Sequence, residues 1–235
     1  MDSHSDIGKR ELLARSILFH RLPAEDLDRL VAVAKTRRVA DKEVIFRKAE
    51  RGNQLSAIIS GRVKLSTMSE NGKEIIFGML GPGEFFGEIS LLDGEERTAT
   101  VTAMEPTELL FIERGDFIAF LECHPTVAIR LLGTLALRLR LTNEMFEDTI
   151  FRNLPARLAK RLLILADNCG QETAEGTRID LKLSQQDIGN MIGTSRESVN
   201  KQMRTWEEEG LIKFRKGYVT ITQPDKLEDL AESSL

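Results

Sequence analysis

The sequence contains very little cysteine and no long apolar run, and both shortages exclude classes of protein. Cys123 and Cys169 are its two cysteines, and they lie too far apart for a structural zinc set or a disulfide framework. No apolar run approaches the length of a membrane span, and the start MDSHSDIGKR lacks the apolar core of a signal peptide. These shortages predict a cytoplasmic protein with no membrane segment.

The sequence also lacks an excess of positive charge. Its formal net charge of −4 over 235 residues argues against a protein that coats nucleic acid through bulk charge. A local basic surface is still compatible with this charge, because duplex binding needs the phosphates to be met at one face only. A composition of 41% hydrophobic and 30% charged residues is typical of a globular chain, and its length allows two modest domains or one large one.

Between about residues 37 and 112 the sequence has the pattern of short antiparallel strands. Runs such as EVIF, RVKLSTM and EIIFGML are rich in β-branched residues, and NGK, GPGE and DGEE separate them with turn chemistry. Helical periodicity precedes them over residues 7–35, where Pro23 opens a second helix. Strands this short and evenly spaced predict a small barrel or jelly roll.

Residues 125–152 predict one long helix with a heptad seam. Turn signals are absent from there until Pro155. The seam positions alternate steps of four and three: Ala128, Leu132, Leu135, Leu139, Thr142, Phe146 and Thr149. A seam sustained for about three heptads favours a coiled coil with a second copy of the chain. The alternative is an amphipathic helix that packs along this seam on its own domain.

Residues 184–210, SQQDIGNMIGTSRESVNKQMRTWEEEG, predict two short helices that meet at a steep angle. Two capping boxes mark the helix starts: Ser184 with Asp187, and Thr194 with Glu197. A glycine lies between the helices and another ends the second one, as expected for a C′ position. This arrangement is a helix-turn-helix, with Asn153 as the predicted N-cap of the helix before it.

The second of these helices separates an apolar stripe from a polar face. Val199, Met203 and Trp206 fall on one arc, which predicts a core stripe. The opposite arc carries Arg196, Glu197, Asn200, Lys201 and Arg204. A solvated charged face is one interpretation. DNA binding is favoured because these side chains suit the reading of base edges, cluster toward the helix N-terminus, and precede KFRKGYVTIT, a basic hairpin placed as a wing.

A third pattern lies in residues 86–101, FGEISLLDGEERTATV, which hold a carboxylate and a guanidinium on either side of a short loop. A turn over GEISLL would present backbone N–H groups to a phosphate oxygen. Arg97 would pair with that phosphate, and Glu88 would accept a hydrogen bond from a sugar hydroxyl. A salt bridge between Glu88 and Arg97 is the alternative. The pattern favours a ligand with a ribose and a single phosphate.

Together these motifs resemble the bacterial transcription regulators of the cyclic AMP receptor protein and fumarate–nitrate reductase regulator (Crp-Fnr) superfamily. The resemblance rests on GEISLLDGEERTATV, RLRLTNEMFED and SRESVNKQMR, in this order and spacing. It implies an α+β fold with a cyclic-nucleotide-binding β-roll (jelly roll), a long dimerisation helix and a C-terminal winged helix-turn-helix. The expected domains are 1–124 with N-terminal helices, 125–152 as dimerisation helix and hinge, and 153–235 as the DNA-binding domain.

The resemblance also implies roles for residues in the nucleotide site. Glu88 takes the ribose 2′-hydroxyl, while Arg97 and Thr98 hold the cyclic phosphate. Thr142 and Asn143 reach the purine, one of the two from the partner subunit, and Asn143 stands where the family has serine. An arginine of the long helix lies beside the base. The full implied ligand set is Gly87, Glu88, Ile89, Ser90, Arg97, Thr98, Arg138, Thr142 and Asn143.

For the DNA-binding domain the resemblance implies direct reading of bases. Arg196 contacts guanine, Glu197 accepts from cytosine N4, and Lys201 stands where the family often has a second arginine. The implied target is a palindrome of TGTGA-like half-sites. The full implied DNA-binding set is Thr194, Ser195, Arg196, Glu197, Asn200, Lys201 and Arg204.

Departures from other branches of the family narrow the choice of ligand. Iron–sulfur members carry an N-terminal cysteine cluster, which this chain lacks. The haem-bearing member uses cysteine and histidine ligands, whereas His4, His20 and His124 lie outside that signature region. The expectation is therefore no metal and no cofactor, with cyclic AMP, cyclic GMP or both as allosteric ligand.

The sequence thus predicts a homodimeric transcription regulator that depends on cyclic nucleotide and is not an enzyme, since no catalytic constellation is visible. The resemblance implies RNA polymerase as a further partner. One alternative is a constitutive DNA-binding regulator of the same fold that needs no nucleotide. The other is a regulatory cyclic-nucleotide module of an enzyme, with a C-terminal domain that binds protein.

Overall fold

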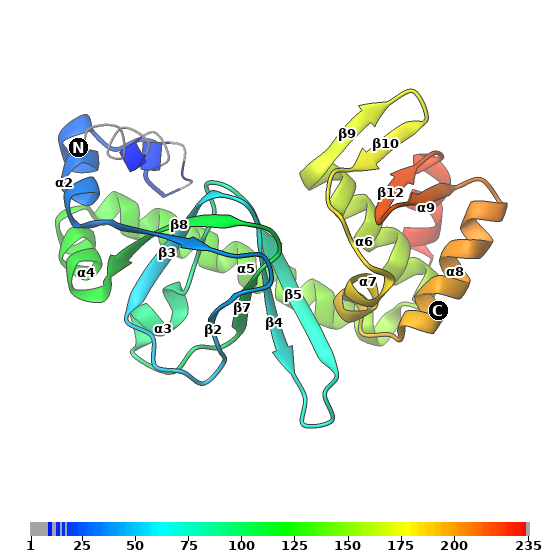
Figure 1. The fold of residues 1–235 in the computed structure, drawn as a ribbon, viewed down its shortest axis with the longest axis horizontal. Helices are drawn as coiled ribbons and strands as arrows, with labels where there is room; N and C mark the ends of the chain where they lie inside the picture. Colours follow the sequence, from blue (N-terminus) through cyan, green and yellow to red (C-terminus); the bar gives the residue numbers. More distant parts are fainter. Residues whose placement is uncertain (1–8, 11–12, 15, 17, 234–235) are drawn as a thin grey trace. The chain divides into compact units, whose positions relative to one another are not determined.

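The computed structural model describes residues 9, 10, 13, 14, 16 and 18–233 (Figure 1). They form two compact units, which are residues up to Thr67 with Phe77–Leu139, and Met68–Ile76 with the chain from Arg140 onward. The expected first helix, over residues 7–22, falls partly outside the described residues. The division between the units falls inside the long helix, and the three-part division expected from the sequence stays a prediction.

Two four-stranded sheets form a β-roll in the first unit. Their strand orders are β1-β8-β3-β6 and β2-β7-β4-β5. The strands are β1 (Lys35–Val39), β2 (Val44–Phe46), β3 (Gln54–Ser60), β4 (Val63–Met68), β5 (Glu74–Leu80), β6 (Phe85–Phe86), β7 (Thr100–Ala103) and β8 (Thr107–Glu113). The strand pattern read from the sequence is confirmed, because β-branched runs fill these strands, NGK joins β4 to β5, and GPGE joins β5 to β6.

Alternation along the strands gives the roll two buried faces. Phe85 and Phe86 are consecutive on β6, so their side chains point to opposite faces. Phe86 joins Ile58 and Val101 in the core between the sheets. Phe85 joins the core that the helices cover. Those helices are α2 (Ala24–Val33), α4 (Arg114–Cys123) and the start of α5 (Pro125–Phe151).

The long helix α5 ends two residues before α6 (Leu154–Cys169). Asn153 caps α6, as predicted, by accepting a hydrogen bond from the backbone N–H of Ala156 at 3.0 Å. Asp148 on α5 forms ion pairs with Arg152 at 2.8 Å and with Lys160 of α6 at 2.7 Å. These ion pairs link the end of α5 to α6 across the break between the two helices.

No single helix among the described residues is long and apolar enough to cross a membrane. Only α4 and α5 taken together meet that test of length and composition, and these two helices are bent by 113° at their junction.

The second unit carries a winged helix-turn-helix. Its sheet has the order β11-β12-β10-β9. The elements after α6 are β9 (Gly170–Thr173), β10 (Gly176–Ile179), α7 (Gln185–Ile192), α8 (Arg196–Glu208), β11 (Ile212–Arg215), β12 (Tyr218–Ile221) and α9 (Pro224–Glu232). The predicted core stripe of α8 is confirmed, since Val199, Met203 and Trp206 are all almost fully buried.

One of the two predicted capping boxes is correct and the other is wrong. Ser184 and Asp187 form the predicted reciprocal pair at the start of α7. Helix α8, however, is capped by Ser195 and not by Thr194. The backbone N–H of Thr194 already donates to Gly189 O at 2.9 Å, which closes the end of α7. That N–H is therefore unavailable to a glutamate carboxylate, and the next hydroxyl along the chain becomes the cap.

Candidate functional site

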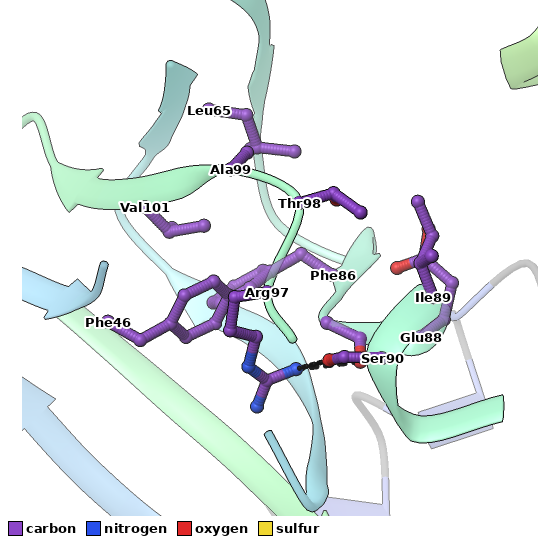
Figure 2. Close-up of a pocket in the computed structure, with 11 residues that line it drawn as sticks. Phe46, Leu65, Phe86, Glu88, Ile89, Ser90, Arg97, Thr98, Ala99 and Val101 are labelled. Atoms are coloured by element: carbon purple, nitrogen blue, oxygen red, sulfur yellow. Dashed lines mark hydrogen bonds between the residues drawn. The ribbon is translucent and has the colours of Figure 1, made fainter. Parts of the chain in front are cut away.

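Six residues predicted from the sequence gather around one small cavity in the β-roll (Figure 2). The cavity has a volume of about 40 Å³. Its walls are Phe46, Leu65, Phe86, Gly87, Glu88, Ile89, Ser90, Arg97, Thr98, Ala99 and Val101. The short helix α3 (Glu88–Asp93) and the segment leading into β7 bring the carboxylate and the guanidinium to this cavity. The predicted turn over GEISLL is thus a single helical turn capped by a glycine.

Arg97 is buried in this site and fully engaged by the protein. Its Nη1 donates to Gly87 O and to Ser90 Oγ, both at 2.8 Å, and its Nη2 donates to Gln54 O at 3.1 Å. Its guanidinium lies over the Phe46 ring, 4.2 Å from the ring centre. Figure 2 shows the side chain between Phe46 and Ser90. These contacts fix the guanidinium in one position within the pocket.

All the hydrogen-bond acceptors of Arg97 are neutral. No carboxylate within the described part of the chain forms an ion pair with it, so the Glu88–Arg97 salt bridge that the sequence allowed is not formed. Burial lowers the pKa of Arg97, while the charges of Glu88 and Glu50 act in the opposite direction. A buried cation without an ion pair is costly, so this position favours an incoming anion.

The buried carboxylate of Glu88 pairs instead with the long helix. Arg138 Nη1 lies 2.6 Å from Glu88 Oε1, and only 4% of the Glu88 side chain is exposed. Arg138 Nη2 donates to Phe85 O at 2.6 Å, and its guanidinium lies over the Phe85 ring, 4.7 Å from the centre. The structure therefore connects α5 to the cavity through the ion pair of Arg138 with Glu88, and a ligand role for Arg138 stays a prediction.

Thr142 and Asn143 follow Arg138 on α5 and are exposed. They belong to the second unit, so their predicted contact with a ligand stays a prediction. The seam itself is exposed at Leu132 and Phe146, with 63% and 67% of these residues accessible.

Helix α5 packs on its own unit through Val127 and Leu131, which are buried, and through the seam residue Leu135, which is half-buried against the same core. The first half of α5 therefore packs on its own domain, as in the alternative interpretation, and a coiled coil with a second copy of the chain stays a prediction. An apolar row of this length on one helix suits a second helix better than solvent.

In the second unit the polar face of α8 is open to solvent at most of the predicted positions. Arg196, Glu197, Lys201 and Arg204 are exposed, as is the cap Ser195, while Thr194 and Asn200 are half-buried. Next to this face lies a groove of about 610 Å³. Its lining residues are Lys182, Leu183, Ser184, Gln185, Gln186, Arg196, Phe214, Lys216 and Gly217. Three of the nine carry a positive charge, so the groove suits a polyanion.

Two local features set the shape and the charge of this surface. Lys216 and Gly217 both have positive φ, 54° and 87°, which forms the tight turn of the wing between β11 and β12. The backbone N–H of Glu197 and the hydroxyl of Ser195 both donate to the Glu197 carboxylate and hold its pKa below the ordinary value. Glu197 therefore stays ionised and acts as an acceptor only.

Several site residues were missed by sequence reasoning. Gly52 passes so close to Arg97 that a Cβ there would overlap the guanidinium. Gln54 and Phe85 contribute backbone carbonyl oxygens, which any residue type possesses. Phe46 supplies the ring over which Arg97 lies. No local sequence signal marks these residues, because each acts on a side chain far along the chain.

Comparison with known proteins gives two family matches. Residues 36–124 match the cyclic nucleotide-binding domain, and residues 156–230 match the Crp-like helix-turn-helix domain. The chain is 31% identical over 217 residues to the CRP-like cAMP-activated global transcriptional regulator of Mycobacterium tuberculosis, covering 92% of this chain and 97% of that one. It is 33% identical over 216 residues to the cyclic AMP receptor protein of Thermus thermophilus, with the same coverage. These relatives are transcription regulators and not enzymes.

The fold has a close counterpart among solved structures. The c-di-GMP responsive global regulator CLP of Xanthomonas campestris superposes with a TM-score of 0.75 at 23% identity, covering 85% of this chain and 99% of that one. This likeness, together with the two domain matches, confirms the predicted α+β architecture of β-roll, long helix and winged helix-turn-helix.

The close approach of Gly52 to Arg97 gives a first test. We expect Gly52→Ala to destabilise the first unit by about 1–3 kcal/mol, because the added methyl overpacks the buried guanidinium. Hydrogen exchange should rise at the amides of residues 50–54 and of α3, which Arg97 ties together. Gly78→Ala on β5 is the matched control, since a Cβ there meets open space. Equal exchange in both variants would contradict a fixed Arg97.

Proposed function

The chain belongs to the Crp-Fnr superfamily of transcription regulators, and on that premise we propose that it is a homodimer whose binding to DNA depends on a cyclic nucleotide. In this proposal the β-roll binds the nucleotide, α5 forms the dimer seam, and the winged helix-turn-helix reads the DNA. Further partners are RNA polymerase and double-stranded DNA in the cytoplasm. The allosteric ligand is cyclic AMP, cyclic GMP or both.

The observation that carries the ligand proposal is the buried Arg97. Its guanidinium has neutral hydrogen-bond partners and no ion pair within the described residues. A cyclic phosphate would supply the missing negative charge, and a charge-assisted bond in a desolvated pocket is stronger than a neutral one. Thr98 lies on the exposed side of the same cavity and adds a hydroxyl. The backbones of Gly87, Ile89 and Ser90 shape the phosphate end.

In the proposal Glu88 accepts a hydrogen bond from the ribose 2′-hydroxyl, and that bond competes with Arg138. The cavity of about 40 Å³ is far smaller than the roughly 300–1,000 Å³ typical of small-molecule sites, so the nucleotide has to open it. Moving Arg138 away from Glu88 is one way to do so, since this arginine joins the cavity to α5. Occupancy of the pocket thereby changes the contacts of the long helix.

The dimer seam provides the second half of the mechanism. Leu132, Leu139 and Phe146 present an exposed apolar row that a second copy of α5 would cover. Thr142 is a polar position in that row and weakens apolar packing there. A purine that contacts Thr142 and Asn143, one of them from the partner subunit, would close the seam. The nucleotide then shifts an existing equilibrium through its differential affinity for the two arrangements.

For DNA we propose that α8 enters the major groove. Arg196 contacts guanine with two hydrogen bonds, Glu197 accepts from cytosine N4, and Lys201 reaches a second guanine. Thr194, Ser195 and Arg204 contact the flanking backbone, and Asn200 lies between them. Two copies related by a dimer axis imply a palindrome of TGTGA-like half-sites about one helical turn apart.

A second candidate function is a constitutive regulator of the same fold that needs no nucleotide. It is favoured by one observation: Glu88 and Arg97 both have hydrogen-bond partners within the protein, so the site is held together without a ligand. Calorimetry with cyclic AMP and a gel shift without nucleotide separate the two candidates. The constitutive candidate predicts no heat of binding and a full shift in the absence of nucleotide.

The phosphate role of Arg97 has a direct test. We expect Arg97→Ala to weaken cyclic AMP binding by about 2–5 kcal/mol in calorimetry, because a desolvated phosphate would lose its main partner. Arg97→Lys keeps the charge without the planar fork and should lose less. Arg38→Ala, at an exposed arginine of β1, is the control. Full affinity in an Arg97→Ala protein with an unchanged circular dichroism spectrum would refute the pocket assignment.

The reading of bases by α8 has its own test. We expect Arg196→Ala to cost about 1–3 kcal/mol of DNA affinity and to relax the preference at one base pair of each half-site. Lys226→Ala, on the exposed side of α9, removes one positive charge without touching α8. Selection from random duplexes with both variants measures the preference. The dimeric proposal fails if the wild-type protein selects no two-fold symmetric motif.

The choice between the two nucleotides tests Thr98. A hydroxyl there accepts from the 2-amino group of guanine in the syn conformation, a donor that adenine lacks. We expect cyclic AMP and cyclic GMP to bind within about 1–2 kcal/mol of each other, roughly the worth of one hydrogen bond. Thr98→Ala should weaken cyclic GMP more than cyclic AMP in calorimetry, so that cyclic AMP is the internal control. Equal losses for both would mean that Thr98 serves the phosphate alone.

A further inference from the structure

The side chain of Asn200 is held by a residue outside its own helix. Gln185, the first residue of α7, donates from Nε2 to Asn200 Oδ1 at 3.1 Å. Asn200 lies on α8 one turn after Arg196 and one turn before Arg204, so it occupies the middle of the exposed polar face. Both members of the pair are half-buried. The amide plane of Asn200 is therefore oriented before any DNA arrives.

This hydrogen bond occupies one of the two lone pairs of the Asn200 oxygen and does not involve its NH₂ group. A carboxamide has one oxygen that accepts and one amino group that donates. Asn200 makes no other side-chain hydrogen bond within the described residues. A second hydrogen bond to an oxygen that already accepts one contributes less free energy than a first bond. The NH₂ group can still contribute the full free energy of a hydrogen bond to a base.

The difference between donor and acceptor matters because the bases differ in the hydrogen-bond donors and acceptors that they present in the major groove. Asparagine recognises adenine with two bonds, in which its oxygen accepts from N6 and its NH₂ donates to N7. Guanine presents two acceptors in the major groove, O6 and N7, and thymine presents O4. Adenine also presents N7, but a side chain that offers only a donor gains nothing from its N6 amino group. The Asn200 oxygen keeps a second lone pair, but the bond from Gln185 fixes the amide plane and weakens that oxygen as an acceptor, so the two-bond match to adenine is disfavoured.

Resting on the proposed DNA-binding function, we propose that Gln185 is a positioning residue that sets the base preference of Asn200 toward guanine or thymine and against adenine. Gln185 also lines the groove beside α8, together with Arg196 and the wing residue Lys216. The pair thus sits at the edge of the surface on which DNA would lie.

The next residue along α7 provides a matched control. Gln186 lines the same groove, but its Nε2 donates at 2.8 Å to Asn190 Oδ1 on the same helix. Loss of Gln186 therefore removes an amide from the same surface without releasing Asn200. Any effect of lost contact with the DNA backbone is common to both positions.

The experiment uses the full chain with saturating cyclic AMP and selection from a random duplex library. Asn200→Ala identifies the base pair that Asn200 reads, as the position whose preference it alone flattens. At that position Gln185→Ala should lower the preference for guanine or thymine over adenine about three- to tenfold, the worth of one hydrogen bond. All other positions should keep their preferences, and Gln186→Ala should leave this one unchanged.

Gln185→Glu should reverse the orientation of the Asn200 amide. A carboxylate accepts from the Asn200 NH₂ group and turns the oxygen outward, so the preference should move toward the amino groups of adenine or cytosine. Its negative charge also lowers affinity for every duplex equally, and that loss does not alter the preference. Melting followed through Trp206, the single tryptophan, checks that each variant is folded.

Two outcomes overturn the inference while DNA binding stands. In one, Gln185→Ala and Gln185→Glu alter affinity for all duplexes alike, so that Gln185 contacts only the DNA backbone. In the other, Asn200→Ala flattens no position, so that Asn200 reads no base. A wild-type protein that selects no motif at all overturns the proposed DNA-binding function, and is thereby distinguished from both.

Discussion

The ion pair between Glu88 and Arg138 is the contact on which the first unit depends most, because it joins two charges that neither the pocket nor the helix could bury alone. Glu88 is nearly inaccessible to solvent, so without a cationic partner its charge would carry a large desolvation cost. Arg138 neutralises that charge. Its guanidinium also donates a hydrogen bond to the backbone carbonyl of Phe85 and lies over the Phe85 ring. The first half of α5 is thus anchored by apolar packing near its start and by the ion pair at Arg138.

That anchoring explains how a small pocket can matter to a long helix. Most of the α5 seam lies apart from the stripe that packs on the β-roll, since Leu132 and Phe146 are exposed while Val127 and Leu131 are buried; the seam residue Leu135 is shared between the two. One face of the helix therefore contacts the pocket through Arg138, and another is exposed. In the proposed mechanism a ligand competes with Arg138 for Glu88 and so changes the contacts of α5 with the pocket. This change then alters how the exposed seam of α5 packs on a second copy of the helix.

The same physical device recurs in the second unit. Arg97 in the pocket and Asn200 on α8 are both polar side chains whose partners are already chosen by the protein. Such pre-orientation reduces the number of conformations that a ligand or a base must select from, and it decides which hydrogen-bonding groups are left to offer. In the proposed function, a ligand or a base therefore meets side chains whose orientation the protein has already fixed.

The sequence by itself determined the features that depend on neighbouring residues. Strand periodicity, the core stripe through Trp206, the cap at Asn153 and the box at Ser184 were all predicted correctly, because each follows from side-chain spacing or from a hydrogen bond that spans a few residues. The box at Thr194 failed for the same kind of reason, since the turn before it had already used the backbone N–H.

Only the tertiary structure decided which groups meet. Glu88 and Arg138 are 50 residues apart, and Arg97 and the Gln54 carbonyl are 43 apart. The sequence placed Glu88 and Arg97 together but left open which cation would neutralise the carboxylate. That choice depends on how distant segments cross, and on a glycine at position 52 that leaves room for a guanidinium. The spacing of residues along the chain does not predict these contacts, because they form between segments that only the fold brings together.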